Sequence, residues 1–433
     1  MRRFRAVLSS RFGPLALTLG AAGVIGVGCT ASRDRDKPPI APYTVLRSQD
    51  DAARAGNYPN LDRQTYDTLA AALAAPPGGA TAVKPSAEPA RPLQILAVSG
   101  GGQYGAYGAG LIVGWTATGQ RPEFDVVTGI SSGAFVASMV YIGPKWDWLL
   151  TKVFTTTPTE GLIKKQPVRS LLTTASLSSS APMKELIDRE VTADFCADIR
   201  TQHQRGRRCY IGTMNQNTRR VVIWDLGAVA SSGRPDADDL VRKILLAAAA
   251  VPFLLPAVEF DLTVNGVNYR EAHNDGGTVC QSFVRLPPSA PTPDPADPAK
   301  RWLTGSKLYI IAGGKVFVDP VEGRPDVIAR ARGAASGSLY ALYRSDLWRL
   351  YAVCVASGTE YRHTAIPQET VVTGSAFEFD PVAMTKLYKL GYERITCGDP
   401  WRRDPPNTSP DEAELPRVGF DFTLPPAPAS PPR

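Results

Sequence analysis

The stretch "VTGISSGAF" (residues 127–135) places a serine between two glycines, with an apolar run before it and another after it. Gly129, Ser131 and Gly133 form a G-x-S-x-G pattern. The preceding run predicts a buried strand and the following run a helix. A serine on the sharp turn from a strand into a helix is well placed to act as a nucleophile. The stretch therefore predicts an α/β fold with Ser131 at a nucleophile elbow.

A second glycine-rich turn lies upstream, in "ILAVSGGGQYGAYGAG" (95–110), where Gly100, Gly102 and Gly105 have G-x-G-x-x-G spacing after a predicted strand. Such turns cradle a pyrophosphate in dinucleotide-binding proteins. Similar turns hold an oxyanion with backbone N–H groups in hydrolases. Asp125 has roughly the spacing of a ribose-binding acid, but it begins the second strand instead of ending it. Nucleotide binding is therefore the remote alternative.

The chain has few residues of the type that usually activates a catalytic serine. His203, His273 and His363 are its only histidines. Only His273 or His363 fits the chain order of α/β-hydrolases, in which the acid and then the histidine follow the serine. His363 lies in the polar stretch "EYRHTAIP", which predicts a solvent-exposed histidine. His273 stays open as a base, and a carboxylate further along the chain offers another.

The stretch "YREAHNDGGTVC" (269–280) supplies a carboxylate on a glycine turn. Asp275 is followed at once by Gly276 and Gly277. Because glycine has no side chain, a carboxylate at this position can approach another loop closely. An Asx-type turn that only closes the preceding strand is the alternative.

Together, the glycine-rich turn, the G-x-S-x-G motif and the D-G-G motif resemble the patatin-like phospholipases, a family of lipid acyl hydrolases with a Ser–Asp dyad. The resemblance implies that Ser131 is the nucleophile and Asp275 the base. It also implies an oxyanion hole formed by Gly100, Gly101 and Gly102. Further glycines would support these motifs: Gly105, Gly129, Gly133, Gly276 and Gly277. The implied reaction is hydrolysis of a carboxylic ester through an acyl-enzyme, of the phospholipase A, lysophospholipase or esterase type.

The motifs cover residues 92–320, and helical patterns extend the implied domain to residue 402. The resemblance implies a three-layer α/β/α fold with a mostly parallel central sheet and a nucleophile elbow. The residues favour the same class, because strand-like runs alternate with helical patterns. The expected strands lie at 93–99, 124–130 and 307–314, as a pair starting at 208 and 219, and as a hairpin turned at Asn265-Gly266.

Tyr104 departs from the family's glycine loop, which usually reads G-G-G-x-R-G. The arginine at that position supports the oxyanion loop in the family, so its absence concerns the support of the loop and not its backbone donors. The departure leaves a second alternative, a non-catalytic exported lipoprotein that keeps the fold and binds lipid or a partner. Phe135, Val136 and Met139 either line an acyl channel or form the buried face of their helix.

The N-terminal segment predicts export. A basic stretch precedes "PLALTLGAAGVIGVGC", which has the length of a signal-peptide core and is too short and glycine-rich for a transmembrane helix. It resembles a bacterial lipoprotein signal in which Cys29 is lipidated, although Gly26 stands where leucine is usual. A simple cleaved signal is the alternative. The expected parts are a signal peptide (1–28), an Ala/Pro-rich tether (29–91), the hydrolase domain (92–402) and a Pro-rich tail (403–433).

The expected location is the membrane-anchored one of a bacterial lipoprotein, in the periplasm or outer membrane, and the alternative is a secreted protein. Composition limits the possible partners. The net charge is +7, but four arginines lie in the first 28 residues and the other cations are spread among acids. This distribution argues against nucleic acid. No residues have the spacing of a metal site, so neither a metal nor a cofactor is expected. The expected partners are an acyl-ester substrate and, through the lipid anchor, a membrane surface; the sequence leaves the oligomeric state open.

Export also makes disulfides a reasonable expectation. Five cysteines follow Cys29 in the chain. Their spacing suggests the pairs Cys196–Cys209 and Cys354–Cys397. Cys280 would then be a buried free thiol.

Overall fold

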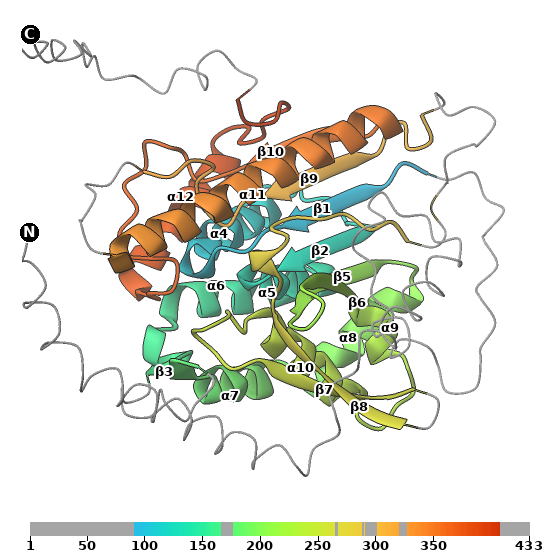
Figure 1. Ribbon diagram of the computed structural model, residues 1–433. Coiled ribbons are helices and arrows are strands. Elements are labelled where there is room, and N and C mark those ends of the chain that lie inside the picture. The colour runs from blue at the N-terminus through green and yellow to red at the C-terminus, as the bar shows by residue number, and fades with distance from the viewer. Residues whose placement is uncertain are drawn as a thin grey trace, which may run out of the picture.

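A mixed β-sheet lies at the centre of the molecule (Figure 1). The computed structural model describes residues 91–407 apart from 166–175, 265–266, 288–289, 291–300 and 320–326. The sheet has the strand order β10-β9-β1-β2-β5-β8-β7, and β6 also pairs with β5. The strands from β10 to β5 are parallel, whereas β6, β7 and β8 pair antiparallel. The strands are β1 (Gln94–Val98), β2 (Val126–Ile130), β5 (Arg208–Asn215), β6 (Arg220–Asp225), β7 (Val258–Val264), β8 (Val267–Asp275), β9 (Lys307–Ile311) and β10 (Glu360–Thr364), and a small separate pair is β3 (Lys164–Lys165) with β4 (Ser178–Ser179).

The middle strands are apolar on both faces. β2 is buried along its whole length and β1 from its second residue onward. Continuous apolar runs of this kind are typical of parallel strands that are covered on both sides. Alternate residues of β1 enter two separate cores, with Leu96 and Val98 in one and Ile95 and Ala97 in the other. The predicted three-layer α/β/α fold with a mostly parallel sheet is confirmed.

Helices form the two outer layers (Figure 1). α11 (Val327–Ser357) contributes Tyr343, Leu347 and Leu350 to the smaller core. The other longer helices contribute apolar side chains to the larger core. They are α4 (Gly105–Ala117), α5 (Ser132–Ile142), α6 (Asp147–Thr156), α7 (Ala181–Glu190), α8 (Ala193–Gln204), α10 (Ala237–Ala248) and α12 (Pro381–Thr396), with a short α9 (Leu226–Ala230) beside them.

The small residues of α4 allow a close helix contact. A Cβ on Gly110 would lie 1.9 Å from the Tyr388 carbonyl oxygen, and a Cβ on Gly391 would lie 2.0 Å from that of Tyr107. The backbones of α4 and α12 therefore touch where both helices lack side chains. This contact ties the C-terminal helix to the helix that follows the glycine-rich turn.

Several sequence predictions can be compared with these elements. The pair β5–β6 and the pair β7–β8 form as expected. The hairpin turn at Asn265-Gly266, the signal peptide, Cys29, nearly all of the tether and the tail beyond residue 407 lie outside the described residues. The division into four parts and the lipid anchor stay predictions. Within the described ranges, no helix combines the length and the apolar character that a membrane span requires.

The suggested disulfides need correction, because all five described cysteines are free thiols. Cys354 belongs to the smaller core, whereas Cys397 is exposed at the end of α12, which packs on the opposite face of the sheet. Cys196 lies beside Asp238 and Cys209 beside Ser138. Burial raises the pKa of the Cys196 thiol to about 12. For Cys354 and Cys397, spacing along the chain is a poor guide because the sheet lies between them; Cys196 and Cys209 lie in the same core but have different neighbours.

Candidate active site

Ser131 lies on the sharp turn between β2 and α5, with φ 54° and ψ −130°. A positive φ is strained for a residue that carries a side chain. Gly129 and Gly133, on either side of Ser131, lie too close to other backbone atoms to carry a side chain. A Cβ on Gly133 would lie 2.5 Å from the Val98 and Ser99 carbonyl oxygens, and a Cβ on Gly129 would lie 2.5 Å from the Gly133 carbonyl oxygen. The elbow thus depends on contacts within its own motif and with the end of β1.

Asp275 is the last residue of β8 and faces the elbow. The Ser131 hydroxyl donates a hydrogen bond to Asp275 Oδ2 at 2.5 Å. The other carboxylate oxygen, Oδ1, accepts from the Gly277 backbone N–H at 2.8 Å. The backbone pairing of Thr213 with Asp275 fixes the register of β8 against β5 and thus the position of the aspartate. A Cβ on Gly276 would lie 2.9 Å from the Gly212 carbonyl oxygen, so the D-G-G turn packs tightly against the backbone of β5.

The environment of Asp275 makes it a stronger base than an exposed aspartate. The residue is 4% exposed. Burial raises the pKa of its carboxyl to about 6, and the hydrogen bonds from Ser131 and Gly277 oppose this rise. Burial dominates because removing a carboxylate from water disfavours its charged form. At neutral pH the carboxylate is ionised and can accept the serine proton.

The glycine loop, residues 100–102, follows β1 and lies against the elbow. A Cβ on Gly100 would lie 2.8 Å from the Ser131 Cβ. A Cβ on Gly101 would lie only 1.6 Å from the Gly313 carbonyl oxygen. Gly105 lies at the start of α4, where a Cβ would crowd the Ser132 hydroxyl at 3.0 Å. Only bare backbone fits between Ser131 and the end of β9, as an oxyanion hole of main-chain donors requires.

A segment from the C-terminal third, residues 373–380, backs the glycine loop; we call it the strap. Gly102 has φ +56°, and a Cβ there would lie 1.9 Å from the Ala376 carbonyl oxygen. Gln103 is fully buried. It donates its backbone N–H to the Ala376 carbonyl at 2.9 Å and its Nε2 to the Ser375 carbonyl at 2.7 Å. Sequence reasoning missed the strap, because nothing in its residues signals a contact about 270 positions away.

Tyr104 joins the same contact. Its hydroxyl donates a hydrogen bond to the Gly374 carbonyl at 2.8 Å. Burial raises the pKa of Tyr104 to about 12, and nearby Tyr340, Glu378 and Asp319 contribute to the rise. The side chain is therefore a neutral donor at any physiological pH. The residue that looked unusual in the sequence ties the glycine loop to the strap.

Two cavities meet at Ser131, and Gly102, Val251 and Phe377 line both of them. The apolar arm encloses about 900 Å³, including space open to solvent, and is lined by residues such as Phe154, Ile187, Phe195 and Leu245. The dyad arm encloses about 810 Å³ on the same measure and contains the glycine loop and Asp275.

The side chains of α5, the helix after the elbow, divide between the two expected roles of lining a channel and forming a buried helix face. Phe135 and Met139 line the apolar arm, whereas Val136 is fully buried in the larger core. Phe377 and Phe379 of the strap cover the same arm. One helix therefore serves both as core and as cavity wall, and the strap completes the wall.

None of the three histidines hydrogen-bonds Ser131. His273 Nδ1 lies 2.9 Å from Thr213 Oγ1 and its Nε2 lies 3.1 Å from Glu271 Oε2, all within the sheet. His203 lies near the end of α8. His363 was expected at the surface, and this expectation is wrong. Its strand, β10, pairs with β9, and the chain returns at Arg402 to cover it, so His363 is 1% exposed and burial lowers its pKa to about 4.

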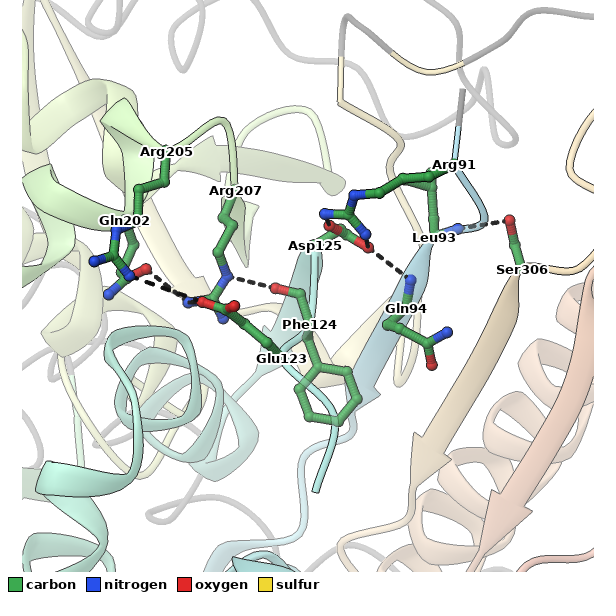
Figure 2. Close-up of polar contacts among 10 residues, drawn as sticks. All are labelled: Arg91, Leu93, Gln94, Glu123, Phe124, Asp125, Gln202, Arg205, Arg207 and Ser306. Atoms are coloured by element: carbon green, nitrogen blue, oxygen red, sulfur yellow. Dashed lines mark hydrogen bonds and ion pairs between the residues drawn. The ribbon is translucent and has the colours of Figure 1, made fainter. Parts of the chain in front are cut away.

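Asp125 directly precedes β2 and lies beside Gln94, at the amino end of β1 (Figure 2). The glycine loop follows the carboxyl end of β1. The Asp125 carboxylate forms an ion pair with Arg91 and accepts the Gln94 backbone N–H at 2.8 Å. A ribose-binding acid belongs at the carboxyl end of its strand, beside the glycine-rich turn. The structure therefore gives Asp125 a structural partner and removes the main support for nucleotide binding.

No cluster of three or more metal-ligating side chains occurs in the ranges that the structure describes. Ser131 and Asp275 lie at the carboxyl ends of β2 and β8. The assigned roles of nucleophile, base and oxyanion loop stay predictions from the motifs, now accompanied by geometry that fits them.

Comparisons with known proteins locate the same region. Residues 96–284 match the family model described as patatin-like phospholipase. No curated protein sequence matches the chain. The crystal structure of VipD from Legionella pneumophila is similar with a TM-score of 0.35 and 11% identity, over 71% of this chain and 66%, just under two thirds, of that chain. The family match spans the glycine loop, the elbow and the Asp275 turn.

Proposed function

We propose that the protein is a serine hydrolase of carboxylic esters of lipids, working through Ser131 and Asp275. The match of residues 96–284 to the patatin-like phospholipase family model supports this proposal. The observation that carries this proposal is the 2.5 Å hydrogen bond from the strained elbow serine to the buried carboxylate. A nucleophile and a base within hydrogen-bond reach are the minimum for covalent acyl transfer.

In the first half-reaction, Ser131 Oγ attacks the ester carbonyl carbon while its proton passes to Asp275 Oδ2. The negative charge that develops on the carbonyl oxygen is stabilised by main-chain N–H groups of the glycine loop. The tetrahedral intermediate then collapses. Asp275 gives its proton to the leaving alcohol, and the acyl group stays on Ser131.

In the second half-reaction, water replaces the alcohol. Asp275 accepts a proton from this water as the oxygen attacks the acyl carbon. The same glycine loop holds the second oxyanion. Collapse returns the proton to Ser131 Oγ and releases a carboxylic acid, so that one ester and one water give one acid and one alcohol.

The two arms suggest how a substrate lies in the site. Asp275 lines the dyad arm and does not line the apolar arm. Because Asp275 must protonate the leaving oxygen, the alcohol departs through the dyad arm. The acyl chain then occupies the apolar arm, where burial of its methylenes stabilises the complex by about 0.8 kcal/mol each.

The test compares wild type, Ser131→Ala and Ser132→Ala on short-chain p-nitrophenyl esters. Ser132 is the neighbouring serine and serves as the matched control. We expect Ser131→Ala to lose about 10³-fold or more in kcat, while Ser132→Ala keeps most of the activity. Equal turnover by wild type and Ser131→Ala contradicts the assigned nucleophile. A wild type with no turnover of any ester supports the alternative of a non-catalytic lipid-binding protein.

The lipid anchor is part of the proposal. Lipidation at Cys29 would hold the enzyme at the membrane that contains its substrates. Expression in a bacterial host with radiolabelled palmitate should label the wild type and leave Cys29→Ser unlabelled. Equal labelling, or none in either protein, removes the anchor and leaves the esterase proposal intact.

A further inference from the structure

The dyad arm offers a phosphate group no free cationic side chain among the residues that the structure describes. Among the described residues that line it, Lys315 is the one cation. Lys315 Nζ lies 2.6 Å from both carboxylate oxygens of Asp319 and 2.9 Å from the Gln368 carbonyl oxygen. An ammonium group has three protons to donate, and these contacts occupy them. The charge of Lys315 is therefore neutralised within the protein.

The surroundings of this arm are acidic. Asp275 lies inside it, and Glu378 acts electrostatically on Tyr104 in its wall. Asp319 acts on Tyr104 too, but its charge is balanced by Lys315. A phosphate group placed here would meet carboxylates, with no cation left among the described lining residues to pair with it. The main-chain N–H groups of the glycine loop are already assigned to the ester oxyanion in the proposed reaction. A phosphate group would therefore need an Arg or Lys side chain of its own.

The arm does offer groups suited to a hydroxyl. Tyr343 on α11 is 6% exposed, and its hydroxyl has no hydrogen-bond partner among the described residues. Burial raises the pKa of Tyr343, and its polar neighbour Ser99 is close enough to oppose this rise but does not meet the Tyr343 hydroxyl in hydrogen-bond geometry. The Ser99 hydroxyl donates to the Gly100 carbonyl and accepts from the Gly313 backbone N–H. A buried hydroxyl without a partner is costly, so a ligand that supplies one gains affinity.

Gln281, which also lines the arm, adds an acceptor. Its Nε2 is used by the Gly277 carbonyl. Its Oε1 lies beside Gly100, where a Cβ would be 3.5 Å away. An amide oxygen and a phenol are together able to accept from and donate to the same small polyol.

We propose that the dyad arm selects esters of uncharged, hydroxyl-bearing alcohols of the glycerol type over esters whose alcohol carries a phosphate, with Tyr343 positioning the alcohol. This inference rests on the proposed ester hydrolysis and names the substrate class for it. The apolar arm binds the same acyl chain in both substrate classes. The preference for one class over the other is therefore set in the dyad arm.

The test uses substrates that share one acyl chain: 1-octanoylglycerol, 1-octanoyl-glycero-3-phosphate, 1-octanoyl-glycero-3-phosphocholine and p-nitrophenyl octanoate. Released octanoate is measured below the micellar concentration of each. We expect kcat/KM for octanoylglycerol to exceed that for either phosphate-bearing ester by about tenfold or more. Equal or faster turnover of a phosphate-bearing ester overturns the inference.

Two variants sharpen the result. Tyr343→Phe should lower kcat/KM for octanoylglycerol about fivefold more than for the nitrophenyl ester, which has no alcohol hydroxyl to position. The control Tyr361→Phe, a buried tyrosine of β10 outside both arms, should leave the ratio unchanged. An unchanged ratio in Tyr343→Phe contradicts its positioning role.

Asp319→Asn tests the charge argument, because it releases the Lys315 ammonium from its carboxylate. It should raise the relative rate on octanoyl-glycero-3-phosphate severalfold, and no change contradicts the argument. Failure of the two proposals is distinguishable. If wild type does not hydrolyse nitrophenyl octanoate, ester hydrolysis itself is overturned. If it does hydrolyse this ester but prefers the phosphate-bearing substrates, only the inference about the alcohol is overturned.

Discussion

The elbow and the strap both shape the surroundings of Ser131, yet they are encoded in different ways. The elbow lies within one strand–turn–helix unit, and its glycines contact residues close in the chain or on the neighbouring strand. The strap reaches the glycine loop from about 270 residues away through Gln103 and Tyr104. The first arrangement follows from local sequence, whereas the second depends on the completed fold. We expect damage to the elbow to abolish catalysis and damage to the strap contact to lower it gradually.

The largest expected effect comes from breaking the elbow. Gly133→Ala places a Cβ 2.5 Å from two carbonyl oxygens at the end of β1. The displaced turn should lower kcat/KM for nitrophenyl esters by about 100-fold or more, because a shift of about 1 Å in a catalytic group costs this much. Circular dichroism should show whether the fold persists.

Gly337→Ala is the matched control for that change. Gly337 lies in α11, and a Cβ there would meet no atom within 4 Å, so alanine fits freely. It should leave activity unchanged and raise stability by about 0.5–1 kcal/mol, since alanine favours helix. Equal losses in both variants contradict the importance of the elbow glycine.

The rate of ester hydrolysis should depend on pH through the ionisation of Asp275, which contacts the serine of the elbow. Its pKa is raised to about 6, and only the ionised form accepts the serine proton. Initial rates should therefore rise about tenfold per pH unit below pH 6 and level off above it. A profile that is already flat from about pH 4.5 upward contradicts the buried carboxylate as base.

Breaking the strap contact should have a smaller effect. Tyr104→Phe removes one hydrogen bond, to the Gly374 carbonyl, and leaves the ring in place. A bond of this kind contributes about 1 kcal/mol, so kcat should fall about fivefold with little change in KM. Tyr269→Phe, on β8 outside both arms, is the control. A loss as large as that of Gly133→Ala would mean that the strap is part of the catalytic unit.

The smallest effect concerns stability. Because the folded-state pKa of Asp275 lies above its ordinary value, the stability it contributes is fully present below about pH 4 and is lost as pH rises through about 6. Asp275→Asn carries no such charge. The difference in melting temperature, Asp275→Asn minus wild type, should therefore be a few degrees larger at pH 8 than at pH 4. An identical difference at both pH values contradicts the desolvation of the carboxylate.

The same contrast explains how far sequence reasoning reached. Ser131 and Asp275 are visible because glycine patterns mark turns whose backbone needs are local. His363 was misjudged because a polar stretch became a strand that Arg402 covers only after folding. The free thiols of Cys354 and Cys397 have the same cause, since a sheet separates them. The strap contacts and the place of Tyr343 in the wall of the dyad arm depend on contacts between distant segments, which a single sequence does not display.

The most direct test of the central claim is to locate the acylated residue. Wild type, Ser131→Ala and Asp275→Asn are treated with a fluorophosphonate, digested, and mapped by mass spectrometry. We expect one adduct on Ser131 in wild type, much slower labelling in Asp275→Asn, and none at this peptide in Ser131→Ala. An unlabelled wild type, or an adduct on another serine such as Ser132, would contradict the Ser131–Asp275 dyad.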